Sequence, residues 1–153
     1  MTTSPGDPDP GAAAAVSVRV LEEQVAAINA HDAARLAASY SEDAVVRDPQ
    51  YPEPLRGRAA VEHDASLFFA AFPDLRAEVT CSVTSGSTLG AEMTLAGTHA
   101  GPLTLPSGDV PPTGRPLRFE MAFFTRIDDD GLVADERRYY DVADQLEQLG
   151  LGG

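Results

Sequence analysis

The fold is decided by residues 117–149, which read LRFEMAFFTRIDDDGLVADERRYYDVADQLEQL. The first part alternates in the way of a β-strand, and one face carries Leu117, Phe119, Met121, Phe123, Thr125 and Ile127. Residues 128–131 (DDDG) predict a turn, in which Gly131 supplies a left-handed backbone conformation. The alternation then resumes, and one face carries Leu132, Ala134, Glu136, Arg138 and Tyr140. Residues 142–149 predict a short terminal helix.

A simple hairpin closed by this four-residue turn fixes which residues face one another. The expected pairs are Ile127 with Leu132, Phe123 with Glu136, Met121 with Arg138 and Phe119 with Tyr140. A carboxylate and a guanidinium therefore lie in a face that is otherwise apolar. Because a buried charge is costly unless it is paired or used, this placement predicts a polar site inside a hydrophobic pocket.

The composition excludes several classes of function. The 153 residues suffice for one domain with a sizeable core, and the formal net charge is −13. Nucleic-acid binding needs a basic surface, and an anionic membrane would repel this chain, so we expect neither partner. No stretch reads as an export signal or reaches the ~20 apolar residues of a membrane span, so a cytoplasmic location is expected. The single cysteine, Cys81, lies in an alternating run and is expected to be a small buried residue.

The rest of the chain places helices before strands. Residues 1–15 are rich in Pro, Gly, Asp and Ala, so we expect a disordered tail, followed by one domain over residues 16–153. Helices are expected at 18–30, 32–40 (capped by Asp32), 58–72 and 142–149, and strands at 44–48, 76–84, 89–99 and in the hairpin. Residues 101–115 hold four prolines and are expected to form a long irregular connection. This order indicates an α+β fold, in which a curved antiparallel sheet wraps over a long helix and encloses a pocket.

Five segments resemble a known family. They are FPDLRAEV (72–79), GTHAGPL (97–103), PPTGR (111–115), FTRIDDDGLV (124–133) and YYDVADQLEQLGL (139–151). In this order they resemble the SnoaL-like polyketide cyclases, which share the cone-shaped α+β fold of nuclear transport factor two and the steroid isomerases. The resemblance covers about residues 18–151. It implies a deep apolar pocket, a homodimer, and acid–base chemistry without a cofactor.

The chain departs from the family at the catalytic base. In the aldol cyclases of the family this base is an aspartate on the strand before the terminal helix, and the matching position here is Arg138. Two polar positions on the preceding strand correspond to Met121 and Phe123. Glu136, on the same face as Arg138, is the nearest carboxylate. The resemblance therefore supports the fold more strongly than it supports the aldol reaction.

Four residues are candidates for catalysis: Glu136, His99, Arg138 and Asp48. Glu136 is the first, because apolar surroundings disfavour the ionised form of a carboxylate, whereas the nearby Arg138 favours it. A structural Glu–Arg pair or a dimer contact is the alternative. His99 closes the alternating face of the 89–99 strand and is either a second acid or base, an oxyanion donor, or a hydrogen-bonded core residue. Asp48, with Tyr51, either reaches the pocket mouth or forms a plain turn before Pro49.

The remaining candidates would contact the substrate. Residues expected to line the pocket are Tyr140, Tyr51, Phe119, Met121, Phe123 and Met93. The histidines at 31, 63 and 99 have no metal-ligand spacing, so no metal is expected. The family resemblance implies that no cofactor is needed.

The first hypothesis is a cyclase that acts by general acid–base catalysis on an apolar, polyketide-like intermediate, through an aldol step or the opening of an epoxide. The loss of the aspartate at position 138 argues against the aldol step. The alternatives are an epoxide hydrolase or double-bond isomerase using the same pocket, and a non-catalytic protein that binds a small molecule.

Overall fold

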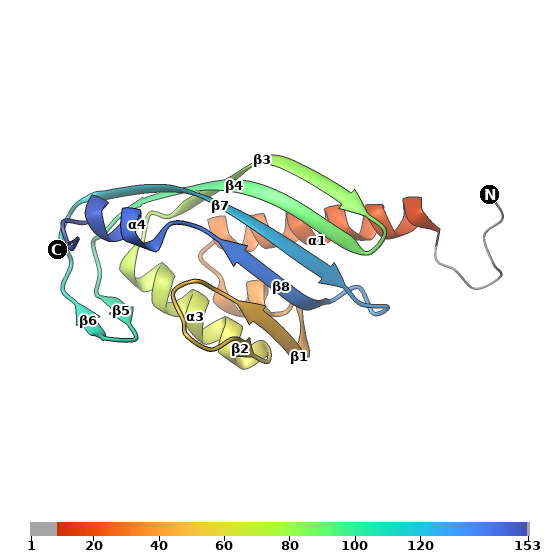
Figure 1. The fold of residues 1–153 in the computed structure, drawn as a ribbon, viewed down its shortest axis with the longest axis horizontal. Coiled ribbons are helices and arrows are strands. Elements are labelled where there is room, and N and C mark those ends of the chain that lie inside the picture. The colour runs from red at the N-terminus through yellow and green to blue at the C-terminus, as the bar shows by residue number, and fades with distance from the viewer. Residues whose placement is uncertain (1–8, 153) are drawn as a thin grey trace.

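A computed structural model describes residues 9–152 and places the helices on one side of a curved sheet (Figure 1). The first helix, α1 (Pro10–Asn29), begins earlier than expected. Asp9 caps it by accepting a hydrogen bond from the Gly11 amide, and the alanines that follow are strong helix formers. Residues 10–15, expected in a disordered tail, are therefore helical, whereas residues 1–8 lie outside the described part of the chain.

Two shorter helices follow α1, and α2 packs between α1 and α3. A turn at His31, whose φ is 55°, leads into α2 (Ala33–Ala37). The Asp32 side chain caps α2 by accepting from the Arg35 amide at 3.0 Å, as predicted. The third helix, α3 (Arg58–Ala71), agrees closely with its predicted range.

The main sheet has six strands in the order β2-β1-β8-β7-β4-β3. They are β1 (Tyr40–Arg47), β2 (Leu55–Arg56), β3 (Arg76–Ser85), β4 (Thr88–Thr98), β7 (Pro116–Ile127) and β8 (Val133–Tyr139). Only β1 and β8 pair in parallel. Helix α4 (Val142–Gln148) follows β8. The α+β fold expected from the sequence is confirmed.

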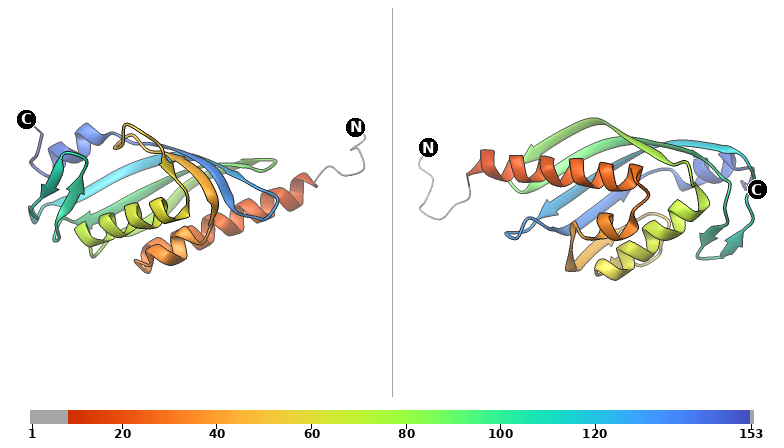
Figure 2. Two further views of the ribbon diagram at one scale, coloured as in Figure 1. Left: turned by 90° about the horizontal axis from the view of Figure 1, so that it is seen from below. Right: turned by 180° about the vertical axis from the view of Figure 1, so that it is seen from behind.

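The connection between β4 and β7 is more regular than expected. It contains a small hairpin of β5 (Leu103–Leu105) and β6 (Gly108–Val110). Both views in Figure 2 place this hairpin at the end of the molecule where α4 lies. The 101–115 segment therefore forms a structured flap instead of an irregular loop.

The predicted register of the last hairpin is wrong by two residues. Thr125 pairs with Glu136, and Phe123 pairs with Arg138. The loop before β8 is longer than assumed, because the Asp128 side chain and backbone hold Leu132 in the turn. The register also shifts at the Arg126–Ile127 step. A displacement of two residues keeps each side chain on its face, so the polar residues still point inward.

A second register shift explains why the prediction for Cys81 is wrong. The shift falls between Val79 and Cys81, and it places Cys81 opposite Glu92 on the outer face of the sheet. Cys81 is exposed. Alternation alone cannot reveal such a bulge, which moves every later residue to the opposite face.

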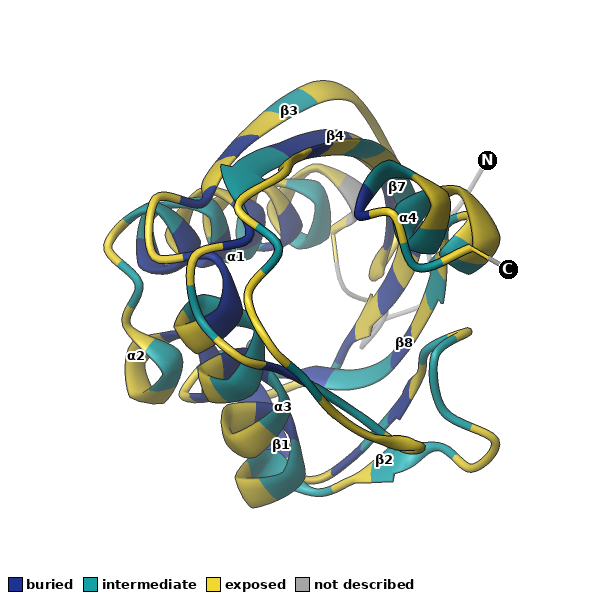
Figure 3. Cartoon of the chain, turned by 90° about the vertical axis from the view of Figure 1, so that its left-hand side faces the viewer, coloured by how far each residue is buried: buried dark blue, intermediate teal, exposed yellow. Residues whose placement is uncertain are grey.

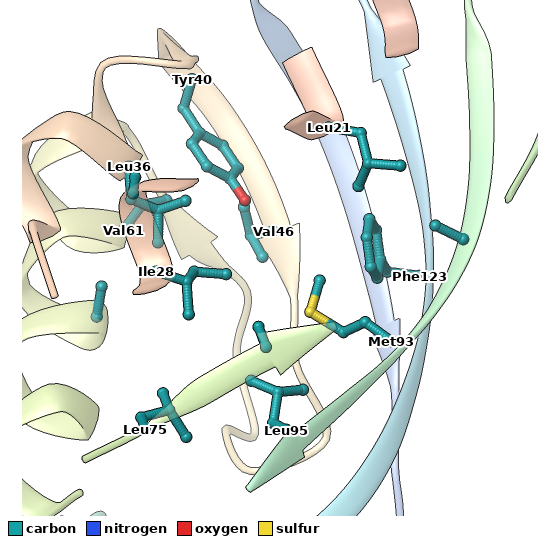
Figure 4. Close-up of a cluster of buried hydrophobic side chains, with 14 of the residues drawn as sticks. Leu21, Ile28, Leu36, Tyr40, Val46, Val61, Leu75, Met93, Leu95 and Phe123 are labelled. Carbon is teal, nitrogen blue, oxygen red and sulfur yellow. The ribbon is translucent and has the colours of Figure 1, made fainter. Parts of the chain in front are cut away.

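The core lies between the helices and the inner face of the sheet. Buried residues face this interior and exposed residues face outward (Figure 3). In Figure 4, Ile28 and Leu36 from the helices face Met93 and Phe123 from the sheet. Tyr40 extends its hydroxyl group between them. Burying each side chain of this size stabilises the folded state by about 1.5–3 kcal/mol. The packed apolar faces therefore hold the sheet in its curve.

Candidate active site

A cavity opens between the inner face of the sheet and the helices. Its empty space, including the mouth, is about 800 Å³. Most of its wall is apolar, with large contributions from Phe68, Phe69, Met93, Phe119, Met121 and Phe123. A mostly apolar hollow with a few polar groups is the usual form of a small-molecule site.

The polar part of the cavity is a cluster of charges around Arg138. The guanidinium donates to Glu136 through Nε at 2.8 Å. Its terminal nitrogen Nη1 donates to Asp48 and to Asp64, both at 3.2 Å. One cation therefore bridges three carboxyl groups, which come from β8, the end of β1 and α3. We call these four residues the carboxylate–arginine cluster.

Glu136 lies deepest in the cluster. Its Oε1 accepts from Thr125 at 3.2 Å, and its Oε2 accepts from Arg138. The Tyr40 hydroxyl lies 2.9 Å from both oxygens. Only 4% of the Glu136 side chain is exposed. Every oxygen of this carboxylate is occupied by protein donors, so its main effect is to hold Arg138 in place.

Asp48 is held almost as firmly. Its Oδ1 accepts from the Tyr140 hydroxyl at 2.5 Å and from the backbone amide of Gln50 at 2.9 Å, while Oδ2 accepts from Arg138. An O–H···O distance of 2.5 Å lies at the short end of the range for such bonds. Asp48 and Tyr140 therefore behave as one hydrogen-bonded pair on the cavity wall.

Asp64 is the most accessible carboxyl group of the cluster. Its side chain is 19% exposed, against 6% for Asp48. It accepts one bond from the Tyr51 hydroxyl at 2.6 Å and one from Arg138. Since a carboxylate has about four acceptor positions, Asp64 can still accept a bond from a ligand.

The environment fixes the protonation of the groups around the carboxylates. Burial alone lowers the pKa of Arg138, but the charges of Glu136, Asp64 and Asp48 outweigh it and hold that pKa well above its ordinary value. Burial and then the Asp48 charge raise the pKa of Tyr140. Burial raises the pKa of Tyr40 and Tyr51 in the same way. Arg138 is thus a permanent cation, and the three tyrosines remain hydroxyl donors.

The structure brings together most of the residues predicted from the sequence. Glu136, Arg138 and Asp48 meet in the cluster. Predicted contact residues that line the cavity are Tyr140, Phe119, Met121, Phe123 and Met93. Tyr51 does not line the cavity, although its hydroxyl group donates to Asp64, which does.

His99, a candidate acid, base or oxyanion donor, does not reach the cavity that holds Glu136, and the structure supports the alternative of a hydrogen-bonded core residue. His99 follows the end of β4, is fully buried and is absent from the cavity wall. Its Nδ1 accepts from the Thr113 amide at 3.1 Å, and its ring packs on Phe72 with centroids 5.5 Å apart. Burial lowers the pKa of His99, and its Nε2 is buried without a hydrogen-bond partner among the described residues. His99 is therefore a neutral core residue that fixes the start of the connection to β7.

Sequence reasoning missed Asp64 and Tyr40. Asp64 follows Val61 by three residues on α3 and directly precedes Ala65, both of which are buried. A carboxylate therefore falls inside the apolar stripe of a helix. The same kind of signal identified Glu136 on its strand, so it was available for Asp64 too. Tyr40 stands where β1 begins, earlier than the predicted strand.

Two further observations concern metals and membranes. Within residues 9–152, no group of three or more His, Cys, Asp or Glu side chains is arranged to hold a metal ion. No helix in that range combines the length and apolar character needed to cross a membrane.

Comparisons with known proteins agree with this geometry. Among solved structures, the chain is similar to IdmH, a candidate polyketide cyclase from Streptomyces antibioticus: identity is 27%, 88% of this chain and 98% of that chain are covered, and the TM-score is 0.70. It is also similar to AclR, a candidate hydroxylase from Streptomyces galilaeus (24% identity, 89% and 96% covered, TM-score 0.74). An LEH-like epoxide hydrolase from M. tuberculosis shares the fold (17% identity, 90% and 92% covered, TM-score 0.66).

The search of curated proteins finds no match. The family comparison is decisive, because the model of the SnoaL-like polyketide cyclases matches residues 18–149. This chain belongs to the SnoaL-like polyketide cyclase family.

Proposed function

We propose that this protein is a cofactor-independent enzyme that closes a ring in an apolar, polyketide-like intermediate by acid–base catalysis. The observation that carries the proposal is the carboxylate–arginine cluster on the wall of an apolar cavity. Proton transfer needs both a group that accepts and a group that donates within reach of one substrate. Membership of a cyclase family supports the same reaction class.

Asp64 is the base in this proposal. It is the most exposed of the three carboxyl groups, and it has an acceptor position left for a substrate hydroxyl. Glu136, the first candidate from the sequence, has both oxygens engaged by Tyr40, Thr125 and Arg138. We therefore assign Glu136 to positioning the guanidinium.

Asp48 and Tyr140 together are the acid. With all three carboxyl groups ionised, the cluster carries two net negative charges in a largely buried setting. We assign the proton that the cluster supplies to Asp48, which shares a 2.5 Å hydrogen bond with Tyr140. Tyr140 alone is a poor acid, because burial and Asp48 raise its pKa. It can donate if a proton on Asp48 replaces the one that it gives up.

These roles fit the opening of an epoxide by an internal hydroxyl group. The hydroxyl oxygen forms a bond to an epoxide carbon and loses its proton to Asp64. The carbon–oxygen bond of the epoxide breaks, its electron pair stays on the oxygen, and this oxygen takes a proton from Tyr140. Asp48 reprotonates Tyr140, while Arg138 stabilises the developing negative charge. The product is an isomer of the substrate, and one proton has moved from Asp48 to Asp64.

Hydrolysis of an epoxide is the second candidate, because Asp64 could accept a proton from water in the same way. The fold shared with an LEH-like epoxide hydrolase supports keeping it. A double-bond isomerase and an aldol cyclase would also use a base in this cavity. A purely non-catalytic binding protein is less well supported, since Glu136 and Arg138 lie inside the cavity and not paired on the surface.

The proposal also includes a homodimer, as expected from the family. Phe124 and Tyr139 are exposed on the outer face of the sheet and pack against each other, with ring centroids 6.2 Å apart. Val83 adds a third exposed apolar side chain to this face. We do not place the dimer contact in the catalytic cavity, which opens on the opposite side of the sheet.

An aryl-substituted 4,5-epoxyalkan-1-ol in oxygen-18 water tests the reaction. We expect a cyclic ether of unchanged mass, without label, and a rate about a hundredfold or more lower for Asp64→Asn. Glu62→Gln is the matched control, because Glu62 lies exposed on the same helix and should leave the rate unchanged. A labelled diol would instead support the hydrolase, and an Asp64→Asn variant of normal rate would remove Asp64 from the mechanism.

A further inference from the structure

A second, smaller hollow lies beside the first, at the end of the molecule that holds α4 and the β5–β6 hairpin. Its empty space, including its opening, is about 330 Å³. The wall is apolar and includes Phe72, Leu103, Leu105, Leu117, Leu146 and Leu149. These residues come from α3, the flap, β7 and α4, so four separate elements contribute to it.

The two hollows share part of their walls. Gln50, Phe68 and Gln145 line both of them. Gln50 also connects this boundary to Asp48 and Tyr140. Its backbone amide donates to Asp48, and its side-chain Oε1 lies 3.5 Å from the Tyr140 hydroxyl. A ligand that contacts the carboxylate–arginine cluster would therefore have the second hollow directly beside it.

The geometry points to the second hollow as a subsite for an uncharged, apolar extension of the substrate. This inference rests on the proposed function, because it assumes that the reacting end of the substrate lies at the cluster. The wall of the subsite carries no charged side chain, so it offers nothing to a carboxylate or an ammonium group. The two glutamines at its boundary could bond a neutral oxygen where the extension joins the reacting end.

The substrate class follows from this arrangement. It would be a molecule with oxygen functions at one end and a short apolar group at the other. Each methylene group buried in the subsite should raise affinity about fourfold, the value expected from transfer out of water. The gain should stop when the chain fills the hollow.

A series of 4-alkylphenols, from methyl to octyl, tests the subsite by binding alone. The phenol hydroxyl is a suitable anchor, because the cluster already accepts bonds from the hydroxyls of Tyr40, Tyr51 and Tyr140. We expect the dissociation constant, measured by calorimetry, to fall about fourfold per methylene and then to level off. Measurement on the intact protein needs no knowledge of the natural substrate.

Two variants of the partly exposed wall move this plateau in opposite directions. Leu146→Trp fills the subsite from α4, so the plateau should come at a shorter chain. Leu105→Ala enlarges it from β5, so the plateau should come at a longer chain. Val83→Ala on the outer face is the matched control and should leave the series unchanged. Melting temperatures of the variants show whether each one is folded.

The outcomes separate the two proposals. A plateau that shifts in both variants supports the subsite even if no epoxide is converted. Affinity that does not depend on chain length, or that changes identically in the wild type and both folded variants, overturns the subsite. Such a result would leave the roles of Asp64 and Asp48 in catalysis untouched.

Discussion

Arg138 is the residue on which the charges of the site depend. Its guanidinium donates to Glu136, Asp48 and Asp64, and its side chain is only 12% exposed. Removing one partner of a buried ion pair leaves the other charge without compensation, which usually costs more than the pair contributes. The stability of the cluster should therefore be strongly non-additive.

A double-mutant cycle of Arg138 and Glu136 measures this dependence. Arg138→Met should lower the free energy of unfolding by about 3–5 kcal/mol, because three carboxyl groups then lie together without their cation. Adding Glu136→Gln should restore part of this loss, because it removes one of the uncompensated charges. Urea unfolding at pH 7 gives the free energies.

The exposed pair of Glu23 and Arg35 is the control for this cycle. Its atoms lie 2.5 Å apart, but both side chains are largely in solvent. Screening by water should make its coupling much weaker than that of the buried pair. Simple additivity at Arg138 and Glu136 would contradict the view that the cluster acts as a unit.

At the residue level, the sequence identified the site through charges in apolar patterns. Glu136 and Arg138 were found because they interrupt the alternation of a strand, and the structure places both in the cavity. His99 was misplaced because alternation gives the face of a strand residue but not the point where the strand ends. Asp64 was missed because the pattern on its helix was read for its apolar members only.

At the level of elements, periodicity predicted most helices and strands. Bulges limited how well it predicted which residues pair and which face of the sheet they lie on. Two of the register shifts in the sheet, at Val79–Cys81 and at Arg126–Ile127, insert an extra residue without a sequence signal that alternation can detect. Contacts between distant elements were equally hidden. The flap of residues 101–115 is an example, because its position depends on how it packs against α3.

Gly101 is the point where this flap meets α3. The amides of Ala100 and Gly101 both donate to the Ala71 carbonyl at 3.1 Å. A Cβ atom on Gly101 would lie 1.9 Å from the Ala70 carbonyl oxygen, which is backbone and cannot turn aside. Gly101→Ala should therefore lower the free energy of unfolding by about 2 kcal/mol or more, as overpacked sites do. Urea unfolding measures the change.

Gly11→Ala is the matched control for Gly101→Ala. Gly11 lies in the first turn of α1, and among residues 9–152 an added Cβ would meet only the Asp9 side chain at 3.6 Å, an ordinary contact. Since alanine favours a helix over glycine, this variant should be neutral or more stable than the wild type. Equal effects of the two substitutions would show that the flap does not depend on close contact with α3.

At the level of the whole molecule, the sheet separates two surfaces of different character. The inner face lines the cavity, and the helices cover it (Figures 2 and 3). The outer face exposes Val83 (63%), Phe124 (43%) and Tyr139 (52%). These residues come from β3, β7 and β8, so the apolar side chains extend across the sheet. A surface of this kind is a candidate for contact with another protein.

A second copy of the chain is the partner that we expect on this outer face. Sedimentation velocity at micromolar concentration should show a dimer for the wild type and a monomer for Phe124→Glu, because the substitution removes an apolar ring from the contact and would bury a charge there. The control is Val18→Glu, which places the same charge at an exposed apolar residue on α1 and should leave the dimer intact. Each copy carries a net charge of −13, so added salt should strengthen the dimer by screening their repulsion. A wild-type monomer under these conditions, or a dimer that persists in Phe124→Glu, would place any contact between copies elsewhere.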